Sequence, residues 1–376
     1  MIFGQPWIEE DEIRAVTEVL RSGWISQGPK VAEFESALAA YLGADQVVAV
    51  SSCTSALFLA LRSCNLQPGD KVLVPTMTFV ATANIVLELG LEVVFADCDP
   101  QTLNIVLPDD ADVKAVIPVH FAGRPCDMTA INDRAKQKGW RVVEDAAHAL
   151  GAEYQGRKIG CSENIACFSF YPNKNLTTIE GGALAFSGNQ SNELAEEFKR
   201  ARLHGMNKDA WKRFHASNHG LSLMDTFGFK MNLTDVQAAV GLVQLKKYQE
   251  ILRRRKLYYQ MYGKELQGLP LQLPAAYDSN CEGCYHLFIG IHKDNKRDEL
   301  REFLSRQEIP TGIHYFPVHQ QPFYARKYPD TQCPTAEYIG QNCLSLPLSA
   351  SMTVEDVERV IAAIWKFYAQ RFYAQR

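Results

Sequence analysis

Short β-branched runs alternate with segments of helical period along the first half of the chain. Apolar residues recur at helical spacing in segments such as Ser55–Arg62, Val80–Leu89 and Met128–Lys138. Because strand and helix in alternation build βαβ units, the pattern predicts an α/β fold with a mostly parallel central sheet covered by helices on both faces. The expected strands are Val47–Val50, Lys71–Val74, Val93–Ala96, Ala115–Val119, Arg141–Glu144, Ile165–Phe170 and Ala183–Phe186.

The second half of the chain has a different pattern. One long helix is expected from Asp235 to about Leu266, and the Gly268-Leu269-Pro270 patch ends it. A strand-like run at Tyr285–Ile291 and further helices follow, at Arg297–Gln307 and from Val354 onward. Since 376 residues suffice for two lobes, we predict a large domain over residues 1–245 and a smaller C-terminal α/β domain over 246–376.

Charge and cysteine usage exclude several functional classes. The net charge is −4, so no basic surface indicates a nucleic acid or an anionic membrane as partner. The segment Met1–Glu12 is acidic rather than apolar, and no apolar run approaches the roughly 20 residues that span a bilayer. Ten cysteines lack a repeating spacing, and the single C-x-x-C, at Cys281 and Cys284, has no second pair beside it. We therefore expect no metal site and a reducing, cytoplasmic location.

Two segments carry groups that suit an aldehyde cofactor. Lys174 lies in a polar turn between the runs Ile165–Phe170 and Gly182–Phe186, where a lysine can form a Schiff base with an aldehyde. Asp145 ends the run Arg141–Glu144, where its carboxylate could partner a pyridinium nitrogen or simply cap the next helix. A lone lysine is most often a solvated surface charge. Ligands of parallel sheets bind beyond the carboxyl ends of the strands, so the two segments are expected to converge.

Three further features follow strand ends. The segment Ser51–Ser55 opens a helix, whose free N–H groups could bind a phosphate, or whose serines could serve only as caps. His148 follows Asp145 by three residues and could reach the same ring, although a lone histidine is commonly structural. Phe79 could stack on a ring or belong to the core. The chain has neither the Gly-x-Gly-x-x-Gly fingerprint nor a P-loop, which opposes a dinucleotide or a nucleoside triphosphate site.

Taken together, these segments resemble the DegT-type family of aminotransferases that act on sugars and depend on pyridoxal phosphate (PLP). The likeness covers almost the whole chain. It rests on Ser22–Pro29, Ser52–Leu57, Pro75–Asn84, Val143–Gly151, the Lys174 turn, Asn232–Ala239 and Ser345–Leu348.

The resemblance implies a fold-type-I homodimer with active sites shared at the subunit boundary. It implies that Lys174 is the Schiff-base lysine and general acid/base, and that Asp145 pairs with the pyridine nitrogen. His148 takes the position near the ring hydroxyl, and Phe79 takes that of the stacking aromatic. The phosphate cradle is matched by Cys53, Thr54 and Ser169.

Two departures from the family pattern concern the cofactor site. Many members carry an asparagine that reaches the neighbouring subunit's phosphate, where this chain has Lys230 in the segment Lys230–Asn232. A lysine can also pair with phosphate, so the resemblance still implies that Lys230 and Asn232 bind the cofactor. A glycine common before Glu-Gly-Gly is replaced by Ile179.

The resemblance also indicates a substrate. The segments Lys230–Asp235 and His204–Trp211 look most like the branch of UDP-4-amino-4-deoxy-arabinose aminotransferases. The loop Ile313–His319 resembles the substrate-side loop, which makes His314 and His319 candidates for contact with the sugar. We therefore predict amination of a nucleotide-linked keto sugar, most simply a 4-keto sugar, with glutamate as donor and 2-oxoglutarate as co-product.

The sequence leaves three alternative functions to weigh. A sugar dehydratase of the same family would carry histidine at the lysine position, and Lys174 opposes it. A PLP-binding regulator without turnover is opposed by the complete set of reactive groups. A nicotinamide-dependent sugar epimerase is opposed by the absent glycine fingerprint.

Overall fold

The computed structural model describes residues 3–206, 223–293 and 295–374, with side chains up to residue 370. The helices are α1 (Glu10–Ser22), α2 (Pro29–Leu42), α3 (Cys53–Ser63), α4 (Ala81–Glu88), α5 (Met128–Lys138), α6 (Ser191–Ala201), α8 (Asp235–Lys246), α9 (Tyr248–Glu265), α10 (Arg297–Ser305), α11 (Pro322–Lys327), α12 (Pro334–Asn342) and α13 (Val354–Ala374). Residues 207–211, part of the segment compared above with the arabinose branch, lie outside the described residues.

Seven strands form the central sheet, in the order β1-β9-β8-β5-β4-β2-β3. They are β1 (Gln46–Val50), β2 (Lys71–Pro75), β3 (Glu92–Ala96), β4 (Ala115–Val116), β5 (Arg141–Asp145), β8 (Ile165–Ser169) and β9 (Gly182–Phe186). The pairs β2–β3, β2–β4, β4–β5 and β5–β8 are parallel, and β9 runs antiparallel to both of its neighbours. The predicted mostly parallel sheet is thus confirmed, with β9 as the reversed strand.

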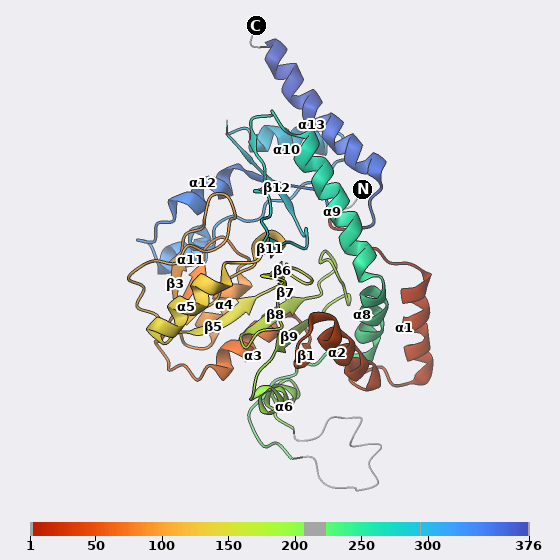
Figure 1. The fold of residues 1–376 in the computed structure, drawn as a ribbon, viewed down its shortest axis with the longest axis vertical. Helices are drawn as coiled ribbons and strands as arrows, with labels where there is room; N and C mark the ends of the chain where they lie inside the picture. The colour runs from red at the N-terminus through yellow and green to blue at the C-terminus, as the bar shows by residue number, and fades with distance from the viewer. Residues whose placement is uncertain (1–2, 207–222, 294, 375–376) are drawn as a thin grey trace.

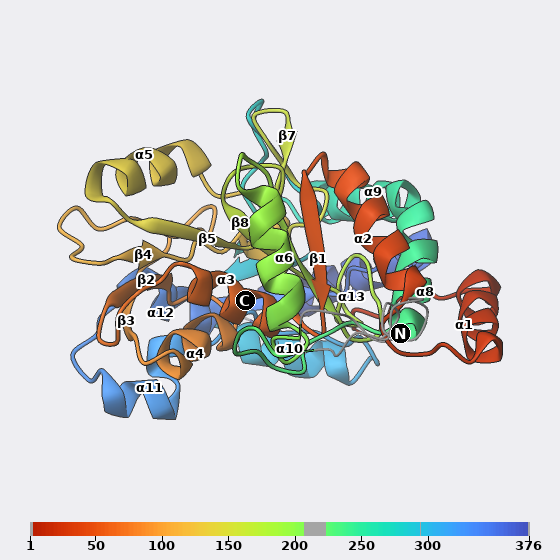
Figure 2. The ribbon, with the colours of Figure 1, turned by 90° about the horizontal axis from the view of Figure 1, so that it is seen from below.

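Alternation along the strands distributes apolar residues to two cores. In β1, Val48 and Val50 pack with residues of α3 and α6, whereas Val47 and Ala49 pack with residues of α2 and α8. Period-2 alternation of buried residues on both faces is what a sheet covered by helices on each side requires. Figure 2 shows α5 on one side of β2 to β5 and α3 and α4 on the other. The expected three-layer arrangement is therefore present.

The C-terminal part has its own small sheet and core. Strands β10 (Leu271–Gln272), β12 (Phe288–His292) and β13 (Cys343–Leu346) are antiparallel in the order β10-β12-β13. Helices α9, α10 and α13 pack around them, and α13 projects beyond the rest of the chain in Figure 1. A second small sheet contains β11 (Cys281–Glu282), β6 (Glu153–Tyr154) and β7 (Arg157–Lys158). Because β6 and β7 follow β5 in the chain, this sheet links the C-terminal part to the large domain.

The long helix expected after Asp235 is divided in two, which corrects the prediction. The break lies at Lys247, whose backbone has φ −98° and ψ 10°, outside the helical region. The following helix, α9, gives Tyr248 and Ile251 to the core of the large sheet and Tyr258 to the C-terminal core. One helix therefore links the two cores, and the division at residues 245 and 246 stays a prediction.

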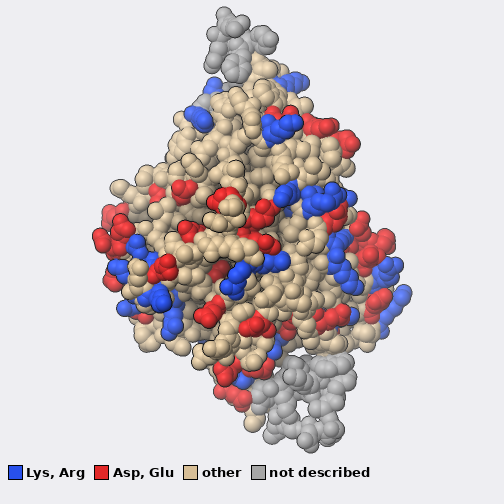
Figure 3. All heavy atoms as spheres, in the orientation of Figure 1, with Lys and Arg blue, Asp and Glu red and all other residues tan. Residues whose placement is uncertain are grey.

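On the face in Figure 3, basic and acidic side chains are interspersed rather than gathered into a patch of one sign. Within the part of the chain that the structure describes, no helix has both the length and the apolar character to cross a membrane. In the same residues, no cluster of three or more histidine, cysteine, aspartate or glutamate side chains is arranged to hold a metal ion.

Candidate active site

A cavity of about 470 Å³ lies where the carboxyl ends of β1, β2, β5 and β8 meet. Parallel strands place their carboxyl ends at one edge of a sheet, so loops far apart in sequence converge there. Eight of the candidate residues line this cavity: Cys53, Thr54, Phe79, Asp145, His148, Ser169, Lys174 and His314.

Lys174 is held in a turn between β8 and β9. Its backbone N–H donates to Tyr171 O at 2.9 Å, and Phe170 N donates to Gly181 O at 2.9 Å, which closes the loop above the strands. Burial lowers the pKa of Lys174 from 10.5 to about 8. A substantial share of the amine is therefore neutral near pH 8, and a neutral amine can add to an aldehyde.

Local hydrogen bonds hold the loop at Ile179, the residue before Glu180-Gly181-Gly182. Ile179 has φ 73°, in the left-handed region that disfavours β-branched residues. Its backbone N–H donates to Thr177 Oγ1 at 2.9 Å, and Thr178 N donates to Phe170 O at 3.0 Å. These hydrogen bonds offset a conformational cost of about 1–2 kcal/mol.

Asp145 ends β5 and is 5% exposed. Its Oδ2 accepts a hydrogen bond from Thr82 Oγ1 at 2.7 Å, and its Oδ1 accepts one from Ala147 N at 3.1 Å. Burial raises the pKa of the Asp145 carboxyl and outweighs these two bonds, which lower it. Each carboxylate oxygen keeps further acceptor capacity. Residues 146–151 form turns rather than a helix, so Asp145 does not cap a helix.

His148 lies three residues further on and is 7% exposed. Its Nε2 is 3.2 Å from the hydroxyl of Tyr315, and its Nδ1 is buried without a hydrogen-bond partner among the described residues. Burial, followed by the charges of Lys174 and His314, lowers the pKa of His148 well below 6.5. The ring is therefore neutral near pH 7 and can donate or accept through Nδ1.

The N-terminus of α3 opens onto the cavity. Ser52 is the cap, and its Oγ accepts from Ser55 N at 3.1 Å. The thiol of Cys53 points away, to Cys167 O at 3.3 Å, so Cys53 offers only its backbone N–H. A Cβ on Gly182 would lie 2.5 Å from Cys53 N, so only glycine lets β9 start so close to this helix end. Free N–H groups here, with the Thr54 and Ser169 hydroxyls, suit an anion.

The donor set as a whole fits PLP. Lys174 supplies an amine for the aldehyde, Asp145 a buried carboxylate for the pyridine nitrogen, and the start of α3 a cradle for the phosphate. Phe79 is 58% exposed, and its ring centroid lies 6.1 Å from that of Tyr315. An exposed aromatic on a cavity wall offers a face on which a flat ring can stack.

Three candidate residues lie elsewhere or apart. Lys230 and Asn232 lie in a segment beside the end of β1. Between them, Met231 O accepts a hydrogen bond from Ser51 N at 2.7 Å. The Lys230 ammonium donates to Asn232 Oδ1, and neither residue lines the cavity formed by this chain.

His319 differs from the prediction, because it does not line the cavity either. Its ring is buried, with Nδ1 2.6 Å from Thr76 Oγ1 and Nε2 3.1 Å from Glu337 Oε1. Both ring nitrogens are thus used inside the protein. His314, five residues earlier, does line the cavity, and its Nδ1 is 2.8 Å from Ser345 Oγ. Burial and then the charge of Lys174 lower the pKa of His314 to about 4.

Two residues of the site, Thr82 and Tyr315, are not among the candidates predicted from the sequence. Thr82 donates to Asp145 and is 2.9 Å from Thr78 Oγ1, so a pair of threonines one helical turn apart orients the carboxylate. Their i, i+4 spacing at the start of a helix was the available signal. Tyr315, next to His314, lines the cavity and meets His148, but its direction depends on the fold of the loop.

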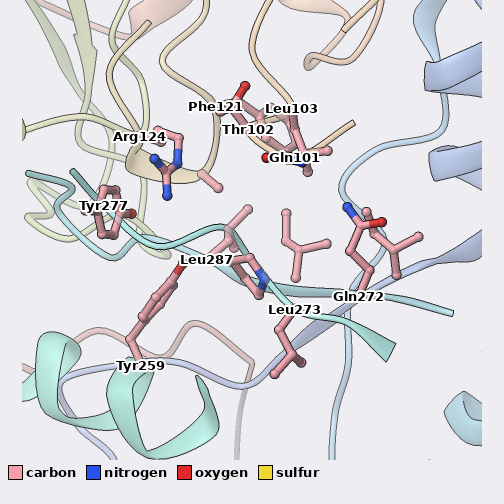
Figure 4. Close-up of a pocket in the computed structure, with 14 residues that line it drawn as sticks. Gln101, Thr102, Leu103, Phe121, Arg124, Tyr259, Gln272, Leu273, Tyr277 and Leu287 are labelled. Atoms are coloured by element: carbon pink, nitrogen blue, oxygen red, sulfur yellow. The ribbon is translucent and has the colours of Figure 1, made fainter. Parts of the chain in front are cut away.

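A second cavity lies between residues 101–124 and 259–291 (Figure 4), and Phe121 is one of the residues that line it. In Figure 4, Arg124 lies beside Tyr277, and Tyr259 lies below them. The Arg124 guanidinium already donates to the carbonyls of Ala275 and Ala276 and lies 4.1 Å from the Tyr277 ring centroid. Its charge is therefore used within the protein, and the first cavity is the stronger candidate.

Comparison with known proteins agrees with this assignment. Residues 6–365 match the DegT/DnrJ/EryC1/StrS aminotransferase family. SpsC of Bacillus subtilis (strain 168), a spore coat polysaccharide biosynthesis protein, is 41% identical over 96% of this chain and 95% of its own length.

Solved structures give the same result. Spr1654 of Streptococcus pneumoniae in its PLP form is 30% identical, with a TM-score of 0.87 over 96% of this chain and 97% of that one. PseC of Helicobacter pylori, an aminotransferase in pseudoaminic acid biosynthesis, is 27% identical, with a TM-score of 0.90 over 98% of this chain and 99% of that one. The expected fold type and cofactor are confirmed by these likenesses. The protein belongs to the DegT/DnrJ/EryC1/StrS aminotransferase family, whose members are PLP-dependent sugar aminotransferases.

Proposed function

We propose that this chain transfers the amino group of glutamate to the ketone of a nucleotide-linked 4-keto sugar. The observation that carries the proposal is a lysine with a pKa of about 8 in the same cavity as a buried carboxylate and a helix N-terminus. The roles of SpsC in spore coat polysaccharide biosynthesis and of PseC in pseudoaminic acid biosynthesis support a sugar substrate. The likeness to the arabinose branch stays a prediction from sequence.

Each cavity residue has a proposed part in holding the cofactor. Lys174 would hold the aldehyde, and Asp145 would accept a hydrogen bond from the protonated pyridine nitrogen. His148 would contact the ring hydroxyl, and Phe79 would stack on the ring. The backbone N–H of Cys53 and the hydroxyls of Thr54 and Ser169 would bind the phosphate, as supported by their place around the start of α3.

PLP, when bound, supplies an aldehyde and an electron-withdrawing ring that stabilises negative charge on the adjacent carbon. The chain supplies the proton transfer. Neutral Lys174 Nζ would accept the proton from the donor's α-carbon and would later give it back, because a pKa of about 8 lets the amine hold or release a proton near neutral pH. Asp145, kept in place by Thr82 and Ala147, would stabilise the positive charge of a protonated pyridine nitrogen.

His314 is the proposed contact to the sugar. It lines the cavity, and its low pKa keeps it a neutral hydrogen-bonding group across the physiological range. Its Nδ1 is engaged with Ser345 Oγ, which leaves Nε2 for a ligand. His319 is not part of this proposal because both of its ring nitrogens are occupied.

We further propose a homodimer whose active sites are shared. Lys230 and Asn232 lie beside the end of β1 but do not line their own chain's cavity, which supports a role toward a neighbouring subunit's phosphate. Exposed apolar side chains near this region, Leu223, Met224 and Phe227, would be covered by such a contact. A cytoplasmic location remains a prediction from cysteine usage.

The decisive experiment is a substrate panel. Purified protein loaded with PLP is incubated with glutamate and a series of nucleotide-linked keto sugars, and the products are identified by mass spectrometry. We expect 2-oxoglutarate and an amino sugar in equal amounts. A deoxygenated sugar without consumption of glutamate would favour a dehydratase, and no product with any member would favour a regulator without turnover.

A further inference from the structure

The segment Cys284–His286 lies directly behind the candidate active site although it comes from the last quarter of the chain. Its three residues are no more than 5% exposed. It connects β11 to β12, yet Cys284 packs in the core of the large sheet. Cys284 N donates to Gly123 O at 3.1 Å, and its thiol donates to His148 O at 2.8 Å. The segment therefore contacts the backbone of a cavity residue.

The same segment forms hydrogen bonds with Asn175, the residue that follows Lys174. Asn175 is 6% exposed, and its Nδ2 donates to Cys284 O at 2.7 Å. Its Oδ1 must then be the acceptor toward His286 Nδ1, at 3.0 Å. These two bonds fix both the amide orientation of Asn175 and the tautomer of His286, which carries its proton on Nδ1.

His286 also lies against His148. The two ring centroids are 4.4 Å apart, with an angle of 37° between the planes. Burial lowers the pKa of His286 well below 6.5, and the nearby His148 and Lys174 lower it further. A neutral ring is thus packed on the neutral ring that lines the cavity, and a charged ring there would repel protonated Lys174.

A buried arginine holds the backbone of His286. Arg255 on α9 is 3% exposed, and its Nη1 donates to His286 O at 3.0 Å and to Tyr285 O at 3.3 Å. The backbone of His286 is held from one side and its ring from the other. Such a doubly fixed side chain can set the position of its neighbours to within fractions of an ångström.

We propose that His286 is a positioning residue for the reaction, which holds the Lys174 turn through Asn175 and supports the His148 ring. The proposal rests on the proposed roles of Lys174 and His148. It goes beyond packing, because it predicts that the hydrogen bond from Nδ1, rather than the volume of the ring, sets the reactivity of Lys174.

Two substitutions separate these contributions. His286→Asn keeps a donor near the position of Nδ1 and loses the ring, whereas His286→Phe keeps the ring and loses the donor. The first readout uses the cofactor-free chain: the pKa of Lys174 is measured from the pH dependence of its labelling by an amine-reactive reagent, with peptide mass spectrometry. The second is the affinity for PLP, and the third is kcat and KM of the loaded enzyme.

For His286→Phe we expect the pKa of Lys174 to rise from about 8 toward 10.5, because the loosened turn admits water. We expect kcat to fall by about 10- to 10²-fold with little change in KM for the sugar, as for a displaced reacting group. His286→Asn should lower the melting temperature more, since it leaves a cavity beside the His148 ring. It should keep the pKa of Lys174 near the wild-type value and lower kcat by less than His286→Phe does.

The proposal is overturned if His286→Phe leaves both the pKa of Lys174 and kcat at the wild-type values, whatever happens to the melting temperature. If that variant does not fold, Asn175→Ser breaks the same bond from the other side and carries the same expectations and the same refutation. The labelling experiment needs no turnover, so its result stands even if the substrate panel shows that the reaction is not a transamination.

Discussion

Replacing Asp145 with asparagine should separate the chemistry of this carboxylate from its shape. Asp145 Oδ1 accepts from Ala147 N, so the amide oxygen of an asparagine must take that place, because two donors would otherwise face each other. The amide NH₂ would then point toward Thr82 and the cavity. A pyridine nitrogen meeting this NH₂ would act as an acceptor and lose its proton.

The expected loss in turnover is large. The buried carboxylate makes a charge-assisted hydrogen bond to a pyridinium, and the substitution replaces it with a neutral one. Removing one preorganised electrostatic partner costs about 10²- to 10³-fold in kcat, which is about 2.7–4 kcal/mol. Thr82 can turn its hydroxyl to accept from the new amide, so the cost to folding should be small by comparison.

The assay compares Asp145→Asn with Glu144→Gln. Glu144 is the adjacent residue, is 2% exposed, and accepts from His120 Nε2 at 3.0 Å on the opposite face of the sheet. Glu144→Gln should reduce stability and leave kcat within about threefold of wild type. Single-turnover rates with glutamate are measured for both after PLP binding is confirmed by absorbance. Wild-type turnover in Asp145→Asn with bound PLP would refute the proposed role of the carboxylate.

Three further predictions concern the same region. Lys174→Met should stabilise the cofactor-free chain by about 1–3 kcal/mol below pH 8. The gain should fade between pH 8 and 10.5, because the unfolded wild-type chain binds the proton more tightly there and wild-type stability therefore rises with pH. A difference in the free energy of urea unfolding that stays constant over this pH range would contradict the prediction. Ile179→Gly should raise the free energy of unfolding by about 0.5–1 kcal/mol, since relief of the left-handed strain exceeds the added chain entropy, and a loss of stability in urea would refute it. Mixing inactive Lys174→Ala chains with inactive chains carrying Lys230→Ala and Asn232→Ala should restore part of the activity in hybrid dimers, whereas proven hybrids without activity would exclude a shared site.

Local patterns in the sequence were sufficient to predict most of the fold. Runs such as Val47–Val50 and Arg141–Glu144 became β1 and β5 because their apolar residues face helices on both sides. The antiparallel direction of β9 was not predictable, because residue periodicity contains no information on strand direction. The break at Lys247 also lacked a signal, since no glycine or proline marks it.

The candidate site was predictable to the extent that it follows strand ends. Lys174, Asp145, His148 and the start of α3 converge because the ends of parallel strands share one edge of the sheet. Contacts between distant segments were not predictable. His286 is 111 residues from Asn175 in sequence, and His319 turns into the core toward Thr76 only because of the fold of its loop.

The most direct measurement is reduction of the PLP-loaded protein with borohydride, followed by digestion and mass spectrometry of the peptides. If Lys174 holds the cofactor, the mass of reduced PLP will be found on the peptide that contains Lys174, and Lys174→Ala will bind PLP without covalent attachment and without turnover. A label on another lysine, or a Lys174→Ala variant that transfers amino groups at a rate close to that of the wild type, would contradict the assignment of Lys174.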